Sequence, residues 1–175
     1  MPPLDPTPPP APPESNPAGA AGFERVRAAL AARGHAHAPR WLDVAARTSQ
    51  QAADALGVAL GQIAKSVVFR RLADDAAVVV IASGDRRIDE QRLAALAGPV
   101  GRADAAFVRE RTGFAIGGVS PVALAGAPLL FIDRELLRFD AIWAAAGHPN
   151  GVFRLTPAEL LALTGAPLAD LVQQA

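Results

Sequence analysis

The spacing of hydrophobic residues changes several times along the chain, and each change predicts a helix or a strand. Apolar residues recur at helical spacing from Phe23 to a stop at Gly34, which predicts a first helix. The sequence from Thr48 to Gln51 is typical of a capping box and predicts a second helix that ends at Gly57. By the same criteria, further short helices are predicted at residues 88–96, 104–111 and 156–163.

Runs of β-branched residues predict the strands. Residues 63–72 and 76–82 are two such runs, and the short polar segment between them predicts a hairpin at the centre of a sheet. Shorter strands are predicted at residues 41–44, 129–133, 142–146 and 152–155. Strands and helices intermix without the regular alternation of a doubly wound fold, so we expect one mixed α+β domain over residues 23–175.

Residues 1–22 differ in composition from the rest of the chain. Nine of the sixteen prolines fall within the first seventeen residues, and no hydrophobic periodicity accompanies them. We therefore predict a disordered Pro/Ala-rich tail, with a polyproline ligand for a partner as the alternative. The tail lacks the basic start of a secretory signal, and no apolar run approaches the roughly 18 residues of a membrane span, so a cytoplasmic location is expected.

Composition narrows the possible functions. With 175 residues, of which 51% are hydrophobic, the chain can bury one core. Seventeen basic residues balance seventeen acidic ones, which excludes a strongly basic DNA-coating protein. The absence of cysteine removes disulfides, thiolate zinc sites and cysteine nucleophiles. His35 and His37 are more typical of surface histidines near a turn than of metal ligands, so neither a metal nor a cofactor is expected.

Lys65 is the only lysine among the seventeen basic residues, the others being arginine. Such a skew suggests that lysine is kept where a compact amine is needed. Strand alternation places Lys65 on the same face as Ile63 and Val67, with Ser66 on the opposite face. An amine in the middle of a strand lies either in a cleft or at an edge where it reaches water.

A glycine-rich loop, TGFAIGGVSP at residues 112–121, is the second unusual feature. The pair Gly117 and Gly118 allows close backbone approach and positive φ. Successive N–H groups in such a loop form a concavity that suits an oxyanion or a phosphate. A tight turn between two elements is the alternative interpretation.

Together these residues resemble the YbaK/EbsC family, the free-standing relatives of the editing domain inserted in bacterial prolyl-tRNA synthetases. The strand from Gln62 to Val68 is similar to the lysine strand of that family, and the loop from Thr112 to Pro121 is similar to its glycine loop. Three later segments match in the same order, at residues 131–133, 145–149 and 155–160. The resemblance covers the chain from Phe23 to its C-terminus.

The resemblance implies trans-editing, which is hydrolysis of the ester that joins a wrong small amino acid to the 3′ end of a tRNA, typically tRNA-Pro. It implies a compact, partly barrel-like mixed sheet surrounded by helices. Mischarged tRNA and prolyl-tRNA synthetase are the implied partners. Neither DNA nor a membrane is an expected partner. Lys65 corresponds to the family's lysine in the substrate cleft, and the loop that ends at Gly117 and Pro121 corresponds to the part that holds the ester and the terminal adenosine.

An aminoacyl ester is already activated, so positioning a water molecule and stabilising the oxyanion are sufficient for hydrolysis. We expect the N–H groups of Gly117 and Gly118 to contact the oxyanion. We expect the ammonium of Lys65 to hold a phosphate or polarise the carbonyl, with a neutral amine acting as a base as the alternative. The residues expected to bind the substrate are Phe114, Ser120, Pro121, Asp133, Gly147 and His148.

Several alternatives stay open. Ser120 and His148 would form a nucleophile and base pair if they met, as in an unrelated small-molecule esterase. Asp133 either orients the substrate amine or Lys65, or caps the helix that follows it. A non-catalytic module that binds tRNA or a synthetase would keep the fold without needing Lys65. The identity of the amino acid and the arginines that contact tRNA do not follow from the sequence.

Overall fold

The centre of the structure is a two-stranded hairpin, as the sequence predicts. In the computed structural model, which describes residues 17–174, β2 (Ile63–Arg71) pairs antiparallel with β3 (Ala77–Ser83). Every residue of β3 is buried, because side chains from both of its faces belong to hydrophobic clusters. The β-branched composition of these runs suits that position, since branched side chains pack well on a pleated surface.

Six further strands extend the hairpin into one sheet within residues 17–174. They are β1 (Arg40–Trp41), β4 (Val100–Arg102), β5 (Leu129–Asp133), β6 (Ile142–Ala145), β7 (Gly151–Leu155) and β8 (Leu168–Ala169). The order is β1-β7-β6-β2-β3-β5-β8, with β4 paired to the far part of β2. The pairs β2–β6, β3–β5 and β5–β8 are parallel and the others antiparallel, so the sheet is mixed as expected.

One edge of β2 has an opening that positions the site described below. On one side β2 pairs with β3 from Ala64 to Arg70. On its other side it pairs with β6 at residues 63–64 only, and with β4 at residues 69–71. Within the described part of the chain, residues 65–68 therefore have no partner strand on that side. The sheet splits there, between β6 and β4.

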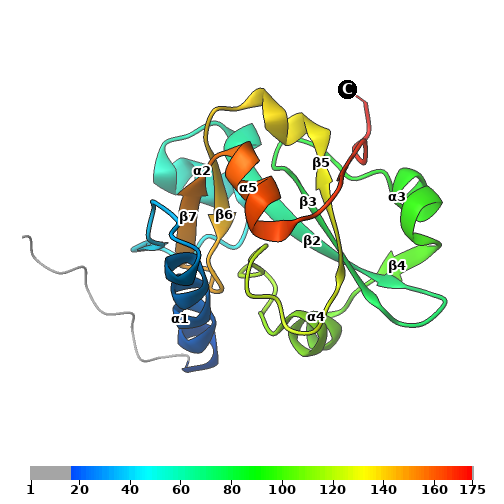
Figure 1. Ribbon diagram of the computed structural model, residues 1–175, viewed down its shortest axis with the longest axis horizontal. Helices are drawn as coiled ribbons and strands as arrows, with labels where there is room; N and C mark the ends of the chain where they lie inside the picture. Colours follow the sequence, from blue (N-terminus) through cyan, green and yellow to red (C-terminus); the bar gives the residue numbers. More distant parts are fainter. Residues whose placement is uncertain (1–16, 175) are drawn as a thin grey trace, which may run out of the picture.

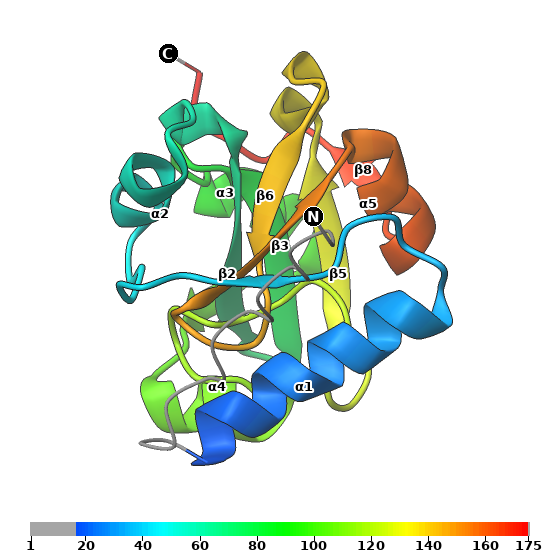
Figure 2. The same cartoon turned by 90° about the vertical axis from the view of Figure 1, so that its left-hand side faces the viewer.

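Five helices surround the sheet in the described residues. They are α1 (Pro17–Ala32), α2 (Ser49–Leu56), α3 (Glu90–Ala97), α4 (Ala105–Thr112) and α5 (Pro157–Thr164). The described residues also contain the 3₁₀ helices η1 (Leu60–Gln62) and η2 (Arg134–Arg138). The predicted capping box of α5 is present, because Thr156 and Glu159 each accept a hydrogen bond from the other's backbone N–H. Figure 2 shows α2 and α5 on opposite sides of the strands, with α1 crossing below them.

The N-terminal helix closes the main hydrophobic core. Phe23, Val26 and Leu30 are buried among residues of β2, β3, β5, β6 and β7. Their spacing of three and four residues places them on one face of α1, as the sequence predicts. Figure 1 shows this helix beneath β6 and β7, at the opposite end of the molecule from α3 and β4. No helix in the described residues is long and apolar enough to cross a membrane.

Several predicted boundaries are wrong. Helix α1 begins at Pro17, earlier than the predicted start at Phe23, because proline fits the first turn of a helix and the alanines that follow favour it. The strand predicted at 41–44 is only Arg40–Trp41. The short strands β4 and β8 were not predicted, because two or three residues carry no periodic pattern. Residues 1–16 of the predicted disordered tail lie outside the described residues.

Candidate functional site

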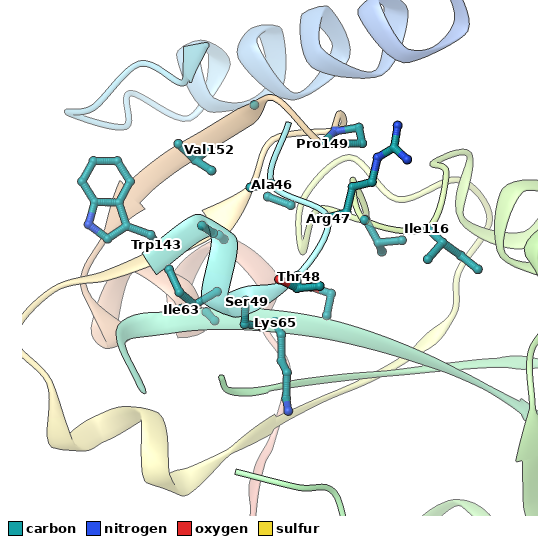
Figure 3. Close-up of a pocket in the computed structure, with 18 residues that line it drawn as sticks. Ala46, Arg47, Thr48, Ser49, Ile63, Lys65, Ile116, Trp143, Pro149 and Val152 are labelled. Atoms are coloured by element: carbon teal, nitrogen blue, oxygen red, sulfur yellow. The ribbon is translucent and has the colours of Figure 1, made fainter. Parts of the chain in front are cut away.

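A cavity of about 230 Å³ lies where the sheet splits beside β2. Three parts of the chain line it: the start of α2, the glycine-rich loop, and the strands β2, β6 and β7 (Figure 3). The lining residues with apolar side chains are Ala46, Ala52, Ile63, Ala64, Ile116, Val119, Trp143, Ala144, Ala145, Pro149 and Val152. The remaining lining residues are Arg47, Thr48, Ser49, Lys65, Ser66, Gly117 and Gly151. The cavity is therefore narrow, mainly apolar, and supplied with a few polar groups from separate elements.

The glycine-rich loop reaches the cavity through its middle. Gly113 ends α4 in the left-handed conformation and turns the chain. Gly117, with φ of 89°, lines the cavity opposite Arg47 and Pro149. A Cβ at Gly118 would lie 2.8 Å from the backbone N and Cα of His148, so glycine is required by this close approach. The N–H of Gly118 donates to the carbonyl oxygen of Ala115 (3.0 Å) and fixes the turn beneath Gly117.

Lys65 belongs to the strand that forms one wall of the cavity, but its side chain runs away from the other labelled wall residues (Figure 3). Its Nζ donates to the carbonyl oxygen of Arg86 (2.5 Å). Burial lowers the pKa of Lys65, and the nearby carboxylate of Asp85 opposes that shift. To reach the cavity, the ammonium must leave the Arg86 carbonyl by rotation of its side chain.

The carboxylate beside Lys65 is held by a polar network. Arg138 donates to Asp85 Oδ1 (2.9 Å) and to the Ser83 hydroxyl (3.0 Å). Burial would raise the pKa of Asp85, but the hydrogen bonds from Arg138 and Ser83 and the charges of Arg138 and Arg86 hold it below its ordinary value. Asp85 is thus a fixed negative charge near the amine.

Ser66 belongs to the cavity wall but is not among the site residues expected from the sequence. It lines the cavity, and its Oγ is the only buried side-chain polar atom without a hydrogen-bond partner within residues 17–174. A buried hydroxyl without a partner costs free energy that a bound ligand recovers. Its alternation with Lys65 along β2 was visible in the sequence, but which face borders a cavity was not.

The N-terminus of α2 forms the cavity wall opposite the strands. Thr48 caps it by accepting from the N–H of Gln51 (3.1 Å), as the predicted capping box requires. The second half of that box is absent, because Gln51 Oε1 accepts instead from the N–H of Arg47 (2.9 Å). Arg47 is exposed at the mouth of the cavity.

His148 packs beside the cavity wall instead of lining it. Its ring stacks on Trp41 with centroids 4.5 Å apart, and its Nδ1 accepts from the N–H of Asn150 (3.0 Å). The ring proton of the neutral form therefore resides on Nε2. Burial lowers the pKa of His148, which favours the neutral form. The neighbouring Pro149 supplies the contact with the cavity.

The other predicted substrate-binding residues lie outside the cavity wall. Phe114 is buried in the main core beneath the guanidinium of Arg25. Ser120 is fully buried, and its Oγ accepts from the N–H of Val122 (3.2 Å). Pro121 lines a separate hollow beside α1. Within residues 17–174 no hydrogen bond joins Ser120 to His148.

Asp133 and Gly147 have contacts that explain their burial. Asp133 Oδ2 accepts from the N–H of Glu135 (3.0 Å) and Oδ1 from that of Leu171 (2.7 Å), so it caps η2 and anchors the C-terminal segment. Gly147, with φ of 81°, packs against the backbone of Gly22 and Phe23 at α1. In the described residues no group of three or more His, Cys, Asp and Glu side chains is placed to hold a metal ion.

Comparison with known proteins relates the chain to one group. The sequence profile of the aminoacyl-tRNA editing domain matches residues 43–163. An uncharacterized Bacillus subtilis protein, YwhH, is 38% identical over 119 residues, covering 67% of this chain and 75% of YwhH. EbsC of Enterococcus faecalis, named as a candidate Cys-tRNA(Pro)/Cys-tRNA(Cys) deacylase, is 26% identical over 126 residues, covering 71% of this chain and 76% of EbsC.

Two further matches link the chain to prolyl-tRNA synthetase. The proline–tRNA ligase of Lactobacillus helveticus is 32% identical over 108 residues, which are 61% of this chain and 19% of the ligase. A crystal structure described as a candidate trans-editing enzyme for prolyl-tRNA synthetase superposes with a TM-score of 0.81 at 42% identity. That superposition covers 87% of this chain and 98% of the other.

Proposed function

This chain belongs to the family of YbaK-type aminoacyl-tRNA editing domains, and we propose that it hydrolyses the ester between a wrongly attached small amino acid and the 3′ end of a tRNA, with tRNA-Pro as the tRNA. The cavity between the split sheet and the glycine-rich loop carries the proposal. It is concave, mainly apolar, and joins a backbone turn to an unpartnered hydroxyl. These are features of a site for a small acyl group.

The reaction needs little chemistry from side chains. Water attacks the carbonyl carbon of the ester. The carbonyl oxygen then becomes the oxyanion of a tetrahedral intermediate. The intermediate collapses by breaking the bond to the ribose oxygen, which takes up the proton that the attacking water releases and leaves as the free hydroxyl of the tRNA. The free amino acid is the other product. A donor already oriented toward the oxyanion lowers the barrier, because it needs no reorganisation during the reaction.

We assign the oxyanion contact to the N–H of Gly117. The N–H of Gly118 already bonds the Ala115 carbonyl and serves to hold the turn. Lys65 supplies positive charge when its side chain turns from the Arg86 carbonyl into the cavity, where it holds a phosphate or polarises the ester. Ser66 Oγ bonds the bound aminoacyl group and thereby gains the partner that it lacks in the free protein.

The size of the cavity supports a small substrate. Five alanines line it, at positions 46, 52, 64, 144 and 145, and larger side chains come from Ile63, Trp143 and Val152. These walls limit the volume of the acyl group that fits. In a double sieve, an editing site of this kind excludes the correct amino acid by its size and admits a smaller, wrong one.

The test is single-turnover deacylation of tRNA-Pro charged separately with Ala, Cys, Ser, Thr and Pro. We expect rapid loss of one or more mischarged forms and no loss of Pro-tRNA. The variants Lys65→Ala and Lys65→Met, of which the second keeps most of the aliphatic stem, should both lose at least tenfold in rate if the ammonium acts in the cavity. Thermal unfolding of each variant checks that it is folded.

Two results would reject this assignment. If no charged tRNA is hydrolysed above the rate without enzyme although tRNA binds, the chain is a binding module and not a deacylase. If hydrolysis depends on Ser120 and His148 and proceeds on simple esters without tRNA, the chain is a small-molecule esterase.

A further inference from the structure

A second hollow lies beside the cavity, on the outer face of the sheet. It has a volume of about 340 Å³ and is lined by Ala36, His37, Ala38, Arg40, Trp143 and Arg154. Trp143 also lines the cavity of the proposed active site, so this one side chain separates the two spaces. The two spaces are therefore neighbours on the two sides of Trp143.

The strand register explains why these residues gather there. Trp143 of β6 is directly opposite Arg154 of β7, and Arg40 of β1 is directly opposite Val152 of β7. Side chains two residues apart on a strand share a face, so Arg40, Arg154 and Trp143 project from the same side of the sheet. The Arg40 guanidinium lies 5.5 Å from the centroid of the Trp143 ring.

In the described part of the chain, no carboxylate forms an ion pair with the arginines of this hollow. Seven arginines in the described residues form ion pairs, namely Arg27, Arg70, Arg71, Arg86, Arg92, Arg134 and Arg138. Within residues 17–174, Arg40 and Arg154 form none, although both are exposed. Glu159 is the acidic residue of the adjoining segment. Its Oε2 lies 3.4 Å from Nδ1 of His35, and its Oε1 accepts a hydrogen bond from the N–H of Thr156 (2.9 Å).

The chemistry of the hollow fits single-stranded RNA. Exposed arginines bind phosphate oxygens, and an indole provides a flat surface on which a base stacks. The net charge of the whole chain is zero, so this local positive charge is not part of a general basic surface. A tRNA ends in unpaired nucleotides, and with the aminoacyl end in the cavity those that precede the terminal adenosine lie close to it.

We propose that the hollow formed by Arg40, Trp143 and Arg154 binds the unpaired nucleotides next to the 3′-terminal adenosine of the tRNA. Arg40 and Arg154 contact their phosphates, and one base stacks on Trp143. The proposal rests on the proposed function, since it takes the aminoacylated 3′ end as the occupant of the neighbouring cavity. The hollow then contributes to binding of the polynucleotide and takes no part in breaking the ester.

The first experiment measures binding of an unacylated acceptor-stem hairpin with a 3′-CCA end by fluorescence anisotropy. The double variant Arg40→Ala/Arg154→Ala should bind on the order of tenfold more weakly than the wild type. The slope of log K against log salt should become shallower by about 1.4, because each phosphate contact on a single strand contributes about 0.7. The matched control is Arg102→Ala/Arg109→Ala, which removes two exposed arginines on β4 and α4 that likewise form no ion pair with any of the described residues.

The second experiment compares two esters of the same amino acid, one on tRNA-Pro and the other on free adenosine. Arg40→Ala/Arg154→Ala should lower kcat/KM on the aminoacyl-tRNA through KM and leave hydrolysis of the aminoacyl-adenosine unchanged, because the latter has no phosphates. Stacking is tested separately with Trp41→Phe, in which Trp143 is the remaining tryptophan, and its fluorescence should be quenched when the hairpin binds.

The outcomes separate this proposal from the proposed function. If Arg40→Ala/Arg154→Ala binds the hairpin and cleaves the aminoacyl-tRNA like the control variant, the hollow is not an RNA site, while editing stands. If no charged tRNA is cleaved but hairpin binding still depends on Arg40 and Arg154, the editing function falls and the RNA site stands.

Discussion

Ser66 shows how one atom can identify a binding surface. Among residues 17–174 its hydroxyl is buried at the cavity without a hydrogen-bond partner, whereas the buried side chains of Ser83, Thr112, Ser120 and Asp133 each have one. Folding alone favours an apolar residue of similar size at such a position. The hydroxyl is therefore best explained by the aminoacyl group that we propose it binds.

Replacement of Ser66 tests this interpretation. Ser66→Ala should leave the free energy of unfolding unchanged or raise it by up to about 1 kcal/mol, because an unsatisfied polar group is removed. The same change should lower kcat/KM for deacylation on the order of tenfold through loss of one hydrogen bond to the substrate. Urea denaturation and single-turnover assays measure the two effects. A variant that loses stability and keeps full activity would show that the hydroxyl serves the fold.

The pKa of Lys65 makes a prediction about stability against pH. Burial lowers this pKa below 10.5, and the charge of Asp85 only partly opposes the shift. Between the lowered pKa and 10.5 the unfolded chain binds a proton that the folded protein has released. The free energy of unfolding should therefore rise with pH across this window relative to Lys65→Met. Urea denaturation of both proteins from pH 8 to 10.5 measures the difference, and parallel curves would contradict it.

At the scale of elements, the sequence predicted long and well-capped segments better than short ones. The hairpin of β2 and β3 and the helix that begins after Thr156 follow the prediction closely, because β-branched runs and capping residues act locally. The strands β4 and β8 depend on partners distant in sequence, which no local pattern reveals. The opening beside residues 65–68 is likewise a property of three strands together.

The glycine-rich loop yields a prediction at this scale. Gly118→Ala should reshape the turn, because its Cβ would lie 2.8 Å from the backbone of His148, which cannot move as a flexible side chain can. We expect a loss of about 2–3 kcal/mol in unfolding free energy and at least a tenfold fall in deacylation, since overpacking shifts the backbone around Gly117. Gly126→Ala is the control.

Gly126 adopts a positive φ of 66°, but its Cβ would meet nothing closer than 3.8 Å. Gly126→Ala should cost about 1 kcal/mol from backbone conformation and leave the rate of deacylation unchanged. Equal rates for the two variants would show that the close packing of Gly118 does not shape the site.

At the scale of the whole molecule, residues outside the matched domain complete the core. The family profile begins at residue 43, yet Phe23, Val26 and Leu30 of α1 fill the main hydrophobic cluster. The ring of Phe23 packs edge-on against Trp41, with centroids 5.2 Å apart, and Trp41 in turn stacks on His148. Helix α1 is thus connected by aromatic contacts to the turn that borders the cavity.

Phe23→Ala should cost about 3–5 kcal/mol in unfolding free energy, as is typical of a buried phenylalanine. Glu24→Ala is its neighbour and control, because it removes only an exposed ion pair with Arg27 and should cost less than about 1 kcal/mol. Thermal and urea unfolding measure both. A small effect of Phe23→Ala would show that the contacts of Phe23 contribute little to the stability of the core.

The candidate site was predictable in part. Lys65 and Gly117 were selected from the sequence, and both line the cavity. Ser120 and Asp133 were selected as well, but they are buried and bonded to backbone groups. Sequence reports residue type and neighbours along the chain, whereas the cavity depends on which strands separate and which side chains face the gap. Ser66 and Trp143 could be recognised only from that geometry.

The separation of β2 from its neighbours also affects how copies of the protein behave toward one another. Residues 65–68 carry backbone groups of the kind that attract a strand from another chain and begin aggregation. The glycine-rich loop and the start of α2 stand on the far side of the cavity and enclose this edge. A shortened loop would thus leave the edge of residues 65–68 open to pairing with a strand of another molecule.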